Sequence, residues 1–116
     1  AMFNADISGW STGNVVNMND VFRRASSFDQ DLGSWNIGSI QFMTGMLTES
    51  GLSSVNYSAT LKGWAGQGDA AIPDGITLDA VGLDYCDDLD TDSARNTILI
   101  GNNGWTINDG NPVACP

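Results

Sequence analysis

The stretch Phe28-Asp29-Gln30-Asp31-Leu32-Gly33-Ser34-Trp35 decides the fold, because it repeats an earlier stretch in register. The earlier copy is Phe3-Asn4-Ala5-Asp6-Ile7-Ser8-Gly9-Trp10, which lies 25 positions before it. The register continues downstream, where Met43 corresponds to Met18. A fixed period of this length is typical of repeat architectures, in which each unit buries its apolar face against the next.

The two copies occupy residues 1–52 and predict an α/β solenoid of leucine-rich-repeat type. In this fold, a right-handed coil is built from short parallel strands and short helices. The spacing of the apolar residues places strands at 10–12 and 35–37. It places helices that begin near Asn19 and Thr44.

Residues 53–116 form a degenerate repeat and an α+β C-terminal cap in this interpretation, continuous with the repeats as one domain. A repeat array needs an atypical end that covers its exposed core. The expected elements are a helix capped by Ser53 or Ser54, a strand at 76–79, a helix over 93–100 capped by Thr91 or Asp92, and a strand at 105–107. Because the chain starts inside a repeat, we expect it to be a piece of a longer one.

The charge of the chain is strongly acidic, with 14 Asp and Glu against four Lys and Arg and a net charge of −10. Nucleic acids and anionic membranes both require a basic surface, so neither is an expected partner. No stretch reaches the ~18–20 apolar residues of a membrane span, so we expect no membrane insertion. Divalent cations and basic partners remain compatible with this charge.

Two cysteines, Cys86 and Cys115, lie in the last third of the chain. Without His or a CxxC pair, a zinc site is not expected. We predict one disulfide, which would stabilise the fold by roughly 3–4 kcal/mol and implies an oxidising, extracellular setting. The alternative is a pair of buried thiols in a cytosolic protein.

The run from Asp84 to Asp92 contains the densest group of carboxylates in the chain. Within it, every second residue from Asp88 to Asp92 is Asp, which is the spacing at the start of an EF-hand-type calcium loop. The pattern then fails, because Ser93 and Leu99 stand where Gly and Glu are needed. No cofactor is required, but calcium is a candidate; the alternative is an exposed acidic loop before a helix N-terminus. The candidate ligands are Asp84, Asp87, Asp88, Asp90 and Asp92.

Residues on the predicted strands and among the aromatics are the candidates for ligand contact. Two of the four tryptophans, Trp10 and Trp35, fall on the repeating ladder, and we expect all four to be core residues. Asp6 and Asp31 recur with the repeat and are expected to cap turns. The candidate binding residues are Ser8, Ser11, Ser34, Asn36, Tyr57 and Tyr85. The two tyrosines are the first candidates for a sugar platform because they fall outside the period.

Catalysis finds no support in the sequence. The absence of His excludes Ser-His-Asp and Cys-His arrangements. Carboxylate pairs could hydrolyse glycosides, but such pairs are commonplace at this density of Asp. We therefore expect a protein that is not an enzyme.

The repeat resembles the FNQDIS-x-W-x-x-x-x-V-x-x-M-x-x-MF pattern of BspA-like leucine-rich-repeat bacterial surface proteins. The residues that carry this resemblance are Phe28 to Trp35, Ile40, Met43 and Met46, although Leu47 stands where the pattern has its last Phe. The C-terminal part, including Gly104-Trp105-Thr106-Ile107, is similar to the ending that such arrays carry. This resemblance implies a secreted or surface-anchored protein used for attachment, with no shared catalytic residues.

The expected function is therefore that of a non-enzymatic extracellular binding or adhesion module at a bacterial cell surface. Its partner would be a protein or glycan on a cell or matrix surface. One alternative is a structural or assembly subunit whose solenoid ends dock other copies. A second alternative is a calcium-dependent module that binds glycans or peptides.

Overall fold

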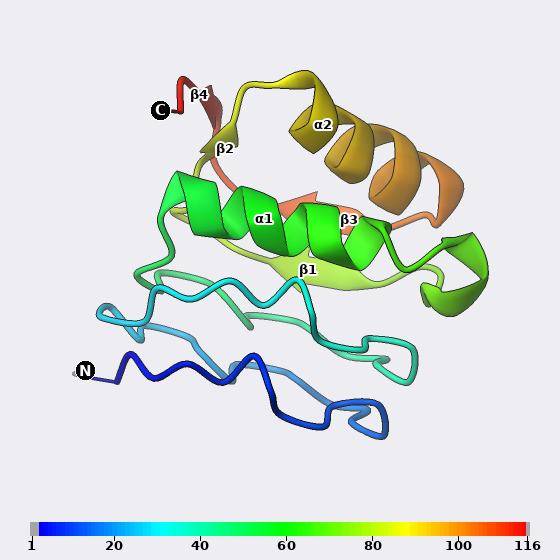
Figure 1. The fold of residues 1–116 in the computed structure, drawn as a ribbon, viewed down its shortest axis with the longest axis horizontal. Helices are drawn as coiled ribbons and strands as arrows, with labels where there is room; N and C mark the ends of the chain where they lie inside the picture. The colour runs from blue at the N-terminus through cyan, green and yellow to red at the C-terminus, as the bar shows by residue number, and fades with distance from the viewer. Residues whose placement is uncertain (1–2, 116) are drawn as a thin grey trace.

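The fold, described for residues 3–115 by a computed structural model, combines two main helical segments with four short strands. The elements in order are α1 (Ser54–Ala65), η1 (Asp69–Ala71), β1 (Thr77–Asp79), β2 (Tyr85–Cys86), α2 (Leu89–Asp92), η2 (Ser93–Asn102), β3 (Thr106–Asn108) and β4 (Pro112–Val113). The strands form two separate parallel pairs, β1 with β3 and β2 with β4. In Figure 1, α1 lies between the N-terminal half of the chain and the helix formed by α2 and η2.

The predicted solenoid is wrong, because the described part of the N-terminal half contains turns in place of a coil of strands and helices. No strand forms at 10–12 or 35–37, and no helix begins near Asn19 or Thr44. Left-handed backbone explains the missing helices: φ is positive at Asp20, Arg24, Gly45 and Glu49. A residue in that conformation cannot continue a right-handed helix. The molecule is instead a small globule with two two-stranded sheets.

Equivalent residues of the two sequence copies nevertheless contact each other. The ring of Phe3 stacks on that of Phe28, with centroids 5.6 Å apart. The indole of Trp10 stacks on that of Trp35 at 6.3 Å. The period of 25 residues therefore reports side-chain stacking between adjacent turns of chain rather than regular secondary structure.

Helix α1 confirms the prediction of a helix that follows Ser53. The hydroxyl of Ser53 accepts a hydrogen bond from the Asn56 N–H at 3.2 Å, which caps the helix. Gly63 brings the helix backbone against Gly33, where an added Cβ would lie 3.1 Å from the Gly63 Cα. The helix can therefore dock directly on the chain segment that the repeat defines.

The second helical segment begins earlier than predicted. The Asp88 carboxylate accepts a hydrogen bond from the Thr91 N–H at 2.7 Å, so the helix starts at Leu89 and Thr91 lies inside it. Asp92 occupies the position before η2 as predicted, but its backbone is already helical and its side chain makes no capping hydrogen bond, so Asp88 supplies the cap. The predicted strands at 76–79 and 105–107 correspond to β1 and β3 within a residue at each end.

Three of the four tryptophans are core residues, as predicted. Trp35, Trp64 and Trp105 are almost fully buried, and each indole N–H donates to a backbone carbonyl. The prediction is wrong for Trp10, which is 59% exposed because its outer face has no neighbouring layer among residues 3–115. Within the same residues, no helix is long and apolar enough to cross a membrane.

Candidate functional site

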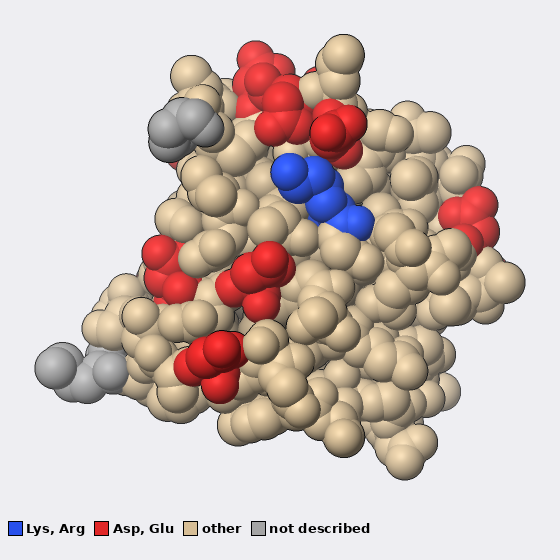
Figure 2. Space-filling view, viewed as in Figure 1, with Lys and Arg blue, Asp and Glu red and all other residues tan. Residues whose placement is uncertain are grey.

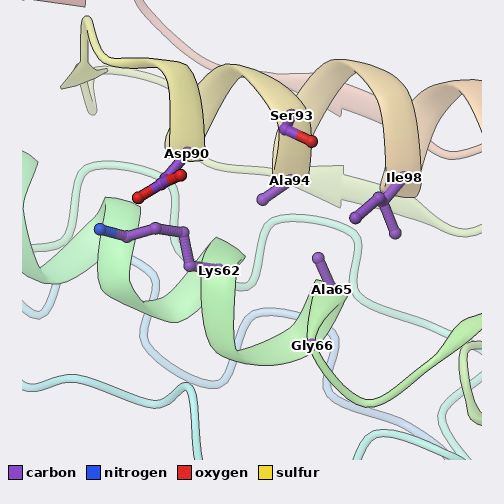
Figure 3. Close-up of a pocket in the computed structure, with 7 residues that line it drawn as sticks. All are labelled: Lys62, Ala65, Gly66, Asp90, Ser93, Ala94 and Ile98. Carbon is purple, nitrogen blue, oxygen red and sulfur yellow. The ribbon is translucent and has the colours of Figure 1, made fainter.

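A hollow between α1 and the second helical segment is one candidate site. It has a volume of about 310 Å³ and is lined by Lys62, Ala65, Gly66, Asp90, Ser93, Ala94 and Ile98. Figure 3 shows the Lys62 and Asp90 side chains pointing toward each other from opposite helices, with Ala65 and Ala94 on the two helices beside them. Figure 2 shows acidic atoms scattered over this face and basic atoms confined to a small patch beside one acidic group. The interhelical hollow therefore offers few polar groups: one cation, one carboxylate and the Ser93 hydroxyl, beside apolar side chains.

A second hollow, which we call the polar groove, has a volume of about 440 Å³. It is lined by Asp20, Arg23, Thr44, Gly45, Thr48, Asp79, Val81 and Asn108. Its walls come from two turns of the N-terminal half and from the ends of β1 and β3. Most of these side chains offer hydrogen-bonding atoms, so the groove suits a polar ligand.

The register of neighbouring chain segments builds the polar groove. Met43 bridges Leu78 in parallel, and Leu78 pairs with Ile107 across β1 and β3. The next residue on each segment is polar: Thr44, Asp79 and Asn108. Parallel segments lie about 4.8 Å apart, so these three side chains form a row.

Asp79 is the fixed centre of the polar groove. Its Oδ1 accepts a hydrogen bond from Asn108 Nδ2 at 2.7 Å, and its Oδ2 accepts one from the Gly45 N–H at 3.0 Å. At the rim, Asp20 and Arg23 form an exposed ion pair at 3.7 Å. Such surface pairs contribute little to stability, so Arg23 and Asp20 are free to rearrange around a ligand.

Thr48 adds a hydroxyl group to the polar groove. The residue is 9% exposed, and its Oγ1 accepts a hydrogen bond from the Val81 N–H at 3.4 Å. The Thr48 hydroxyl lines the groove and can still donate its own hydrogen to a bound molecule.

The four predicted binding residues of the repeats are exposed but line neither hollow. Ser8 donates its hydroxyl to Asp6 at 2.7 Å, and Ser34 donates to the Ser8 carbonyl at 3.2 Å. The Asn36 side-chain Oδ1 accepts a hydrogen bond from the Gly38 N–H at 2.9 Å. Ser11 is exposed as well. The structure therefore uses the Ser8 and Asn36 side chains in local turns and the Ser34 hydroxyl to join the two sequence copies.

The turn-capping prediction for Asp6 and Asp31 is confirmed. Asp6 Oδ1 accepts hydrogen bonds from both the hydroxyl and the N–H of Ser8, and these bonds lower the pKa of the Asp6 carboxyl. Asp31 Oδ1 accepts from the Gly33 N–H at 2.8 Å. Both aspartates hold turns that shape the repeat.

The proposal that Tyr57 and Tyr85 form an exposed sugar platform is corrected by their burial. Tyr57 is 0% exposed and Tyr85 is 9% exposed. Tyr57 Oη donates to Asp109 Oδ2 at 2.7 Å, and the Arg95 guanidinium lies 4.4 Å from the centroid of the Tyr85 ring. The tyrosines therefore belong to the interior of the C-terminal part.

The centre of this interior network is the ion pair between Arg95 and Asp109. Arg95 donates through Nε at 3.0 Å and Nη2 at 2.6 Å to the two carboxylate oxygens. Burial opposes the charge on Arg95, but the hydrogen bonds and charge of Asp109 outweigh it and raise the arginine pKa. Burial and the nearby Asp109 raise the pKa of the Tyr57 hydroxyl well above 10.0. The network joins α1, η2, β2 and the chain after β3.

The acidic run does not converge into a calcium site. Among residues 3–115, no group of three or more His, Cys, Asp or Glu side chains is arranged to hold a metal ion. Asp88 caps α2, and the hydrogen bonds from Thr91 lower the pKa of its carboxyl. Asp84 accepts from the Asn111 N–H at 2.9 Å, Asp90 lies at the interhelical hollow, and Asp87 and Asp92 line neither hollow. The arrangement matches the alternative interpretation, an acidic segment at a helix N-terminus.

The predicted disulfide between Cys86 and Cys115 is confirmed, with an S–S distance of 2.05 Å. It ties β2 to the tail that follows β4. The residues of the polar groove were missed by sequence reasoning. The available signal was the repeat register, because Asp20 and Gly45 share one position of the period and Arg23 and Thr48 share another.

A comparison with protein families gives a match over residues 1–67 to the family described as "Mycoplasma protein of unknown function, DUF285". The matched segment contains both sequence copies and α1. The match is consistent with a surface-protein repeat of the BspA type. Comparisons with curated proteins and with solved structures gave no match.

Proposed function

We propose that this chain, which belongs to the DUF285 family, is a non-enzymatic binding or adhesion module of a bacterial surface or secreted protein. The family match hints at surface exposure. The resemblance of Phe28–Trp35 to the FNQDIS-x-W repeat, and of the C-terminal part to its usual ending, supports the more specific BspA-like assignment. The disulfide is compatible with an oxidising, extracellular location.

The observation that carries the proposal is the polar groove. It collects hydroxyl, amide, carboxylate and guanidinium groups at the open surface of a disulfide-linked scaffold. Surface groups of this kind give orientation and specificity to a bound polar ligand. The chain contains no His, so the groove has no imidazole for acid–base catalysis. Binding a protein or glycan of a cell or matrix surface is the function that fits.

Attachment of protein-coated beads tests the proposal. Beads that carry the intact, oxidised protein should attach to mucin-coated or fibronectin-coated surfaces more strongly than albumin-coated beads. Parallel assays in calcium and in EDTA separate the calcium-dependent alternative from the general one. Attachment no stronger than that of albumin beads on every surface would refute the proposed function.

A second candidate function is assembly, and the exposure of Phe3 and Trp10 favours it. Phe3 is 43% exposed and Trp10 is 59% exposed, whereas their counterparts Phe28 and Trp35 are buried. Exposed apolar patches on a protein surface often mark sites of protein contact. If copies associate through this face, light scattering after size-exclusion chromatography should show a mass that rises with concentration and that Trp10→Ser returns to the monomer value. A concentration-independent monomer would remove this candidate.

A further inference from the structure

We propose that the polar groove binds a neutral saccharide through a pair of adjacent hydroxyl groups. The inference rests on the proposed function, because it names a glycan as the partner and the polar groove as its site. It does not involve calcium or the acidic run.

The pair formed by Asp79 and Asn108 supplies the recognition chemistry. The hydrogen bonds from Asn108 Nδ2 and the Gly45 N–H hold the Asp79 carboxylate in place. Each carboxylate oxygen can accept a further hydrogen bond, and the Asn108 amide retains a second N–H and its carbonyl oxygen. Each sugar hydroxyl both donates and accepts, so two neighbouring hydroxyls can donate to Asp79 and accept from Asn108.

The threonines extend the same chemistry along the row. Thr48 lines the groove, and its hydroxyl can donate a hydrogen bond to a ligand oxygen there. Thr44 is exposed beside Asp79 in the row and offers a second hydroxyl.

Charge and shape narrow the ligand class. The groove contains two carboxylates, Asp20 and Asp79, against one guanidinium, Arg23, so an anionic sugar would meet net repulsion. Val81 is 50% exposed at the groove and gives the apolar C–H face of a sugar ring a contact. The volume of about 440 Å³ falls within the size range of small-ligand sites, which is roughly 300–1,000 Å³.

Nuclear magnetic resonance titration of the intact protein tests the groove directly. The probes are the methyl glycosides of mannose, galactose and N-acetylglucosamine, with sialic acid as the anionic comparison. At least one neutral glycoside should shift the amide signals of Gly45, Thr48 and Val81, and sialic acid should not. Shifts confined to other parts of the molecule, or no shifts with any probe, would overturn the inference.

Two variants make the assignment specific. Thr44→Val and Asn108→Ala both change exposed side chains of the groove. The double variant that carries both should bind the saccharide about tenfold more weakly. Thr97→Val is the matched control, because Thr97 is an exposed residue of η2 outside both hollows, and it should bind like the wild type. Unfolding curves establish that the double variant and the Thr97→Val control remain folded. Equal affinity in the double variant and the wild type would contradict the inference.

The bead assay then separates this inference from the proposed function. If wild-type beads attach to mucin and the double variant does not, both proposals are supported. If the double variant attaches equally, the groove is not the glycan site, although the chain is still adhesive. If the glycosides bind in the groove but no surface retains the beads, the saccharide site stands and the adhesion function fails.

Discussion

The buried ion pair between Arg95 and Asp109 gives the sharpest test of how the C-terminal part is held together. The Asp109 side chain is 1% exposed and the Arg95 side chain is 14% exposed. Arg95→Met would leave the carboxylate with a hydrogen bond from Tyr57 alone, and its Oδ1 would lose its donor. Removing one partner of a buried pair typically costs about 3–5 kcal/mol, because an uncompensated charge remains in the interior.

That loss is a large share of the stability expected for a domain of this size, which is about 5–15 kcal/mol. Arg95→Lys should fall between the wild type and Arg95→Met. Lysine keeps the charge, but it cannot match both carboxylate oxygens or stack on Tyr85 as the planar guanidinium does. Urea unfolding followed by tryptophan fluorescence, with the disulfide intact, measures each variant.

A double-mutant cycle shows whether the pair itself is responsible. The double variant Arg95→Met with Asp109→Asn buries no charge, so it should lose about 2 kcal/mol less than the sum of the two single variants. The slope of the urea transition should stay the same, which would show that the unfolded states are comparable. A loss below about 1 kcal/mol for Arg95→Met, or additive single effects, would refute the reasoning.

Three further predictions concern the backbone, the helix cap and the disulfide. Gly63→Ala should destabilise the protein by about 1–3 kcal/mol in urea unfolding, because the new Cβ would overlap the backbone of Gly33. This loss is expected even though alanine favours helices more than glycine does. A stabilised variant would contradict this packing. Asp88→Ala should lower the melting temperature near neutral pH. The pKa of Asp88 is lowered on folding, so its contribution exists above the ordinary value of 3.8 and is lost as the pH falls below it; circular-dichroism melts should therefore converge in acid, and a gap that widens there would contradict the sign. Reduction of the bond between Cys86 and Cys115, which closes a loop with a sequence separation of 29, should cost about 3–4 kcal/mol by the chain-entropy model; equal urea midpoints with and without reductant would contradict it.

The sequence period predicted which side chains touch but not the backbone that carries them. The stacking of Phe3 on Phe28 follows directly from their shared register. Apolar residues three positions apart are compatible with helices and with successive turns, and periodicity alone does not separate them. The left-handed backbone of Asp20 and Gly45 produces turns in place of helices. The presence of Asp in the sequence does not show that its backbone will be left-handed.

The sequence also could not show which residues of the repeat are buried. Trp10 and Trp35 occupy one position of the period, yet only Trp35 is enclosed. Its indole N–H donates to the Ile7 carbonyl, and Trp10 covers one of its faces. Trp10 has the same side chain but no such cover, so its environment is a property of the stack rather than of the residue. Local cues did better: Ser53 and the two cysteines were identified because capping and disulfide pairing depend on residue chemistry.

The polar groove shows why the candidate site was the hardest feature to predict. Thr44, Asp79 and Asn108 become neighbours only because Met43 bridges Leu78 and Leu78 pairs with Ile107. A shift of one residue in either register would turn the following side chain to the opposite face. The separations of these residues along the chain follow no common period, so no motif links them. The register that buries one residue on each segment therefore turns the next residue toward the groove. The polar groups that recognise a ligand are placed by the same pairing that aligns the core.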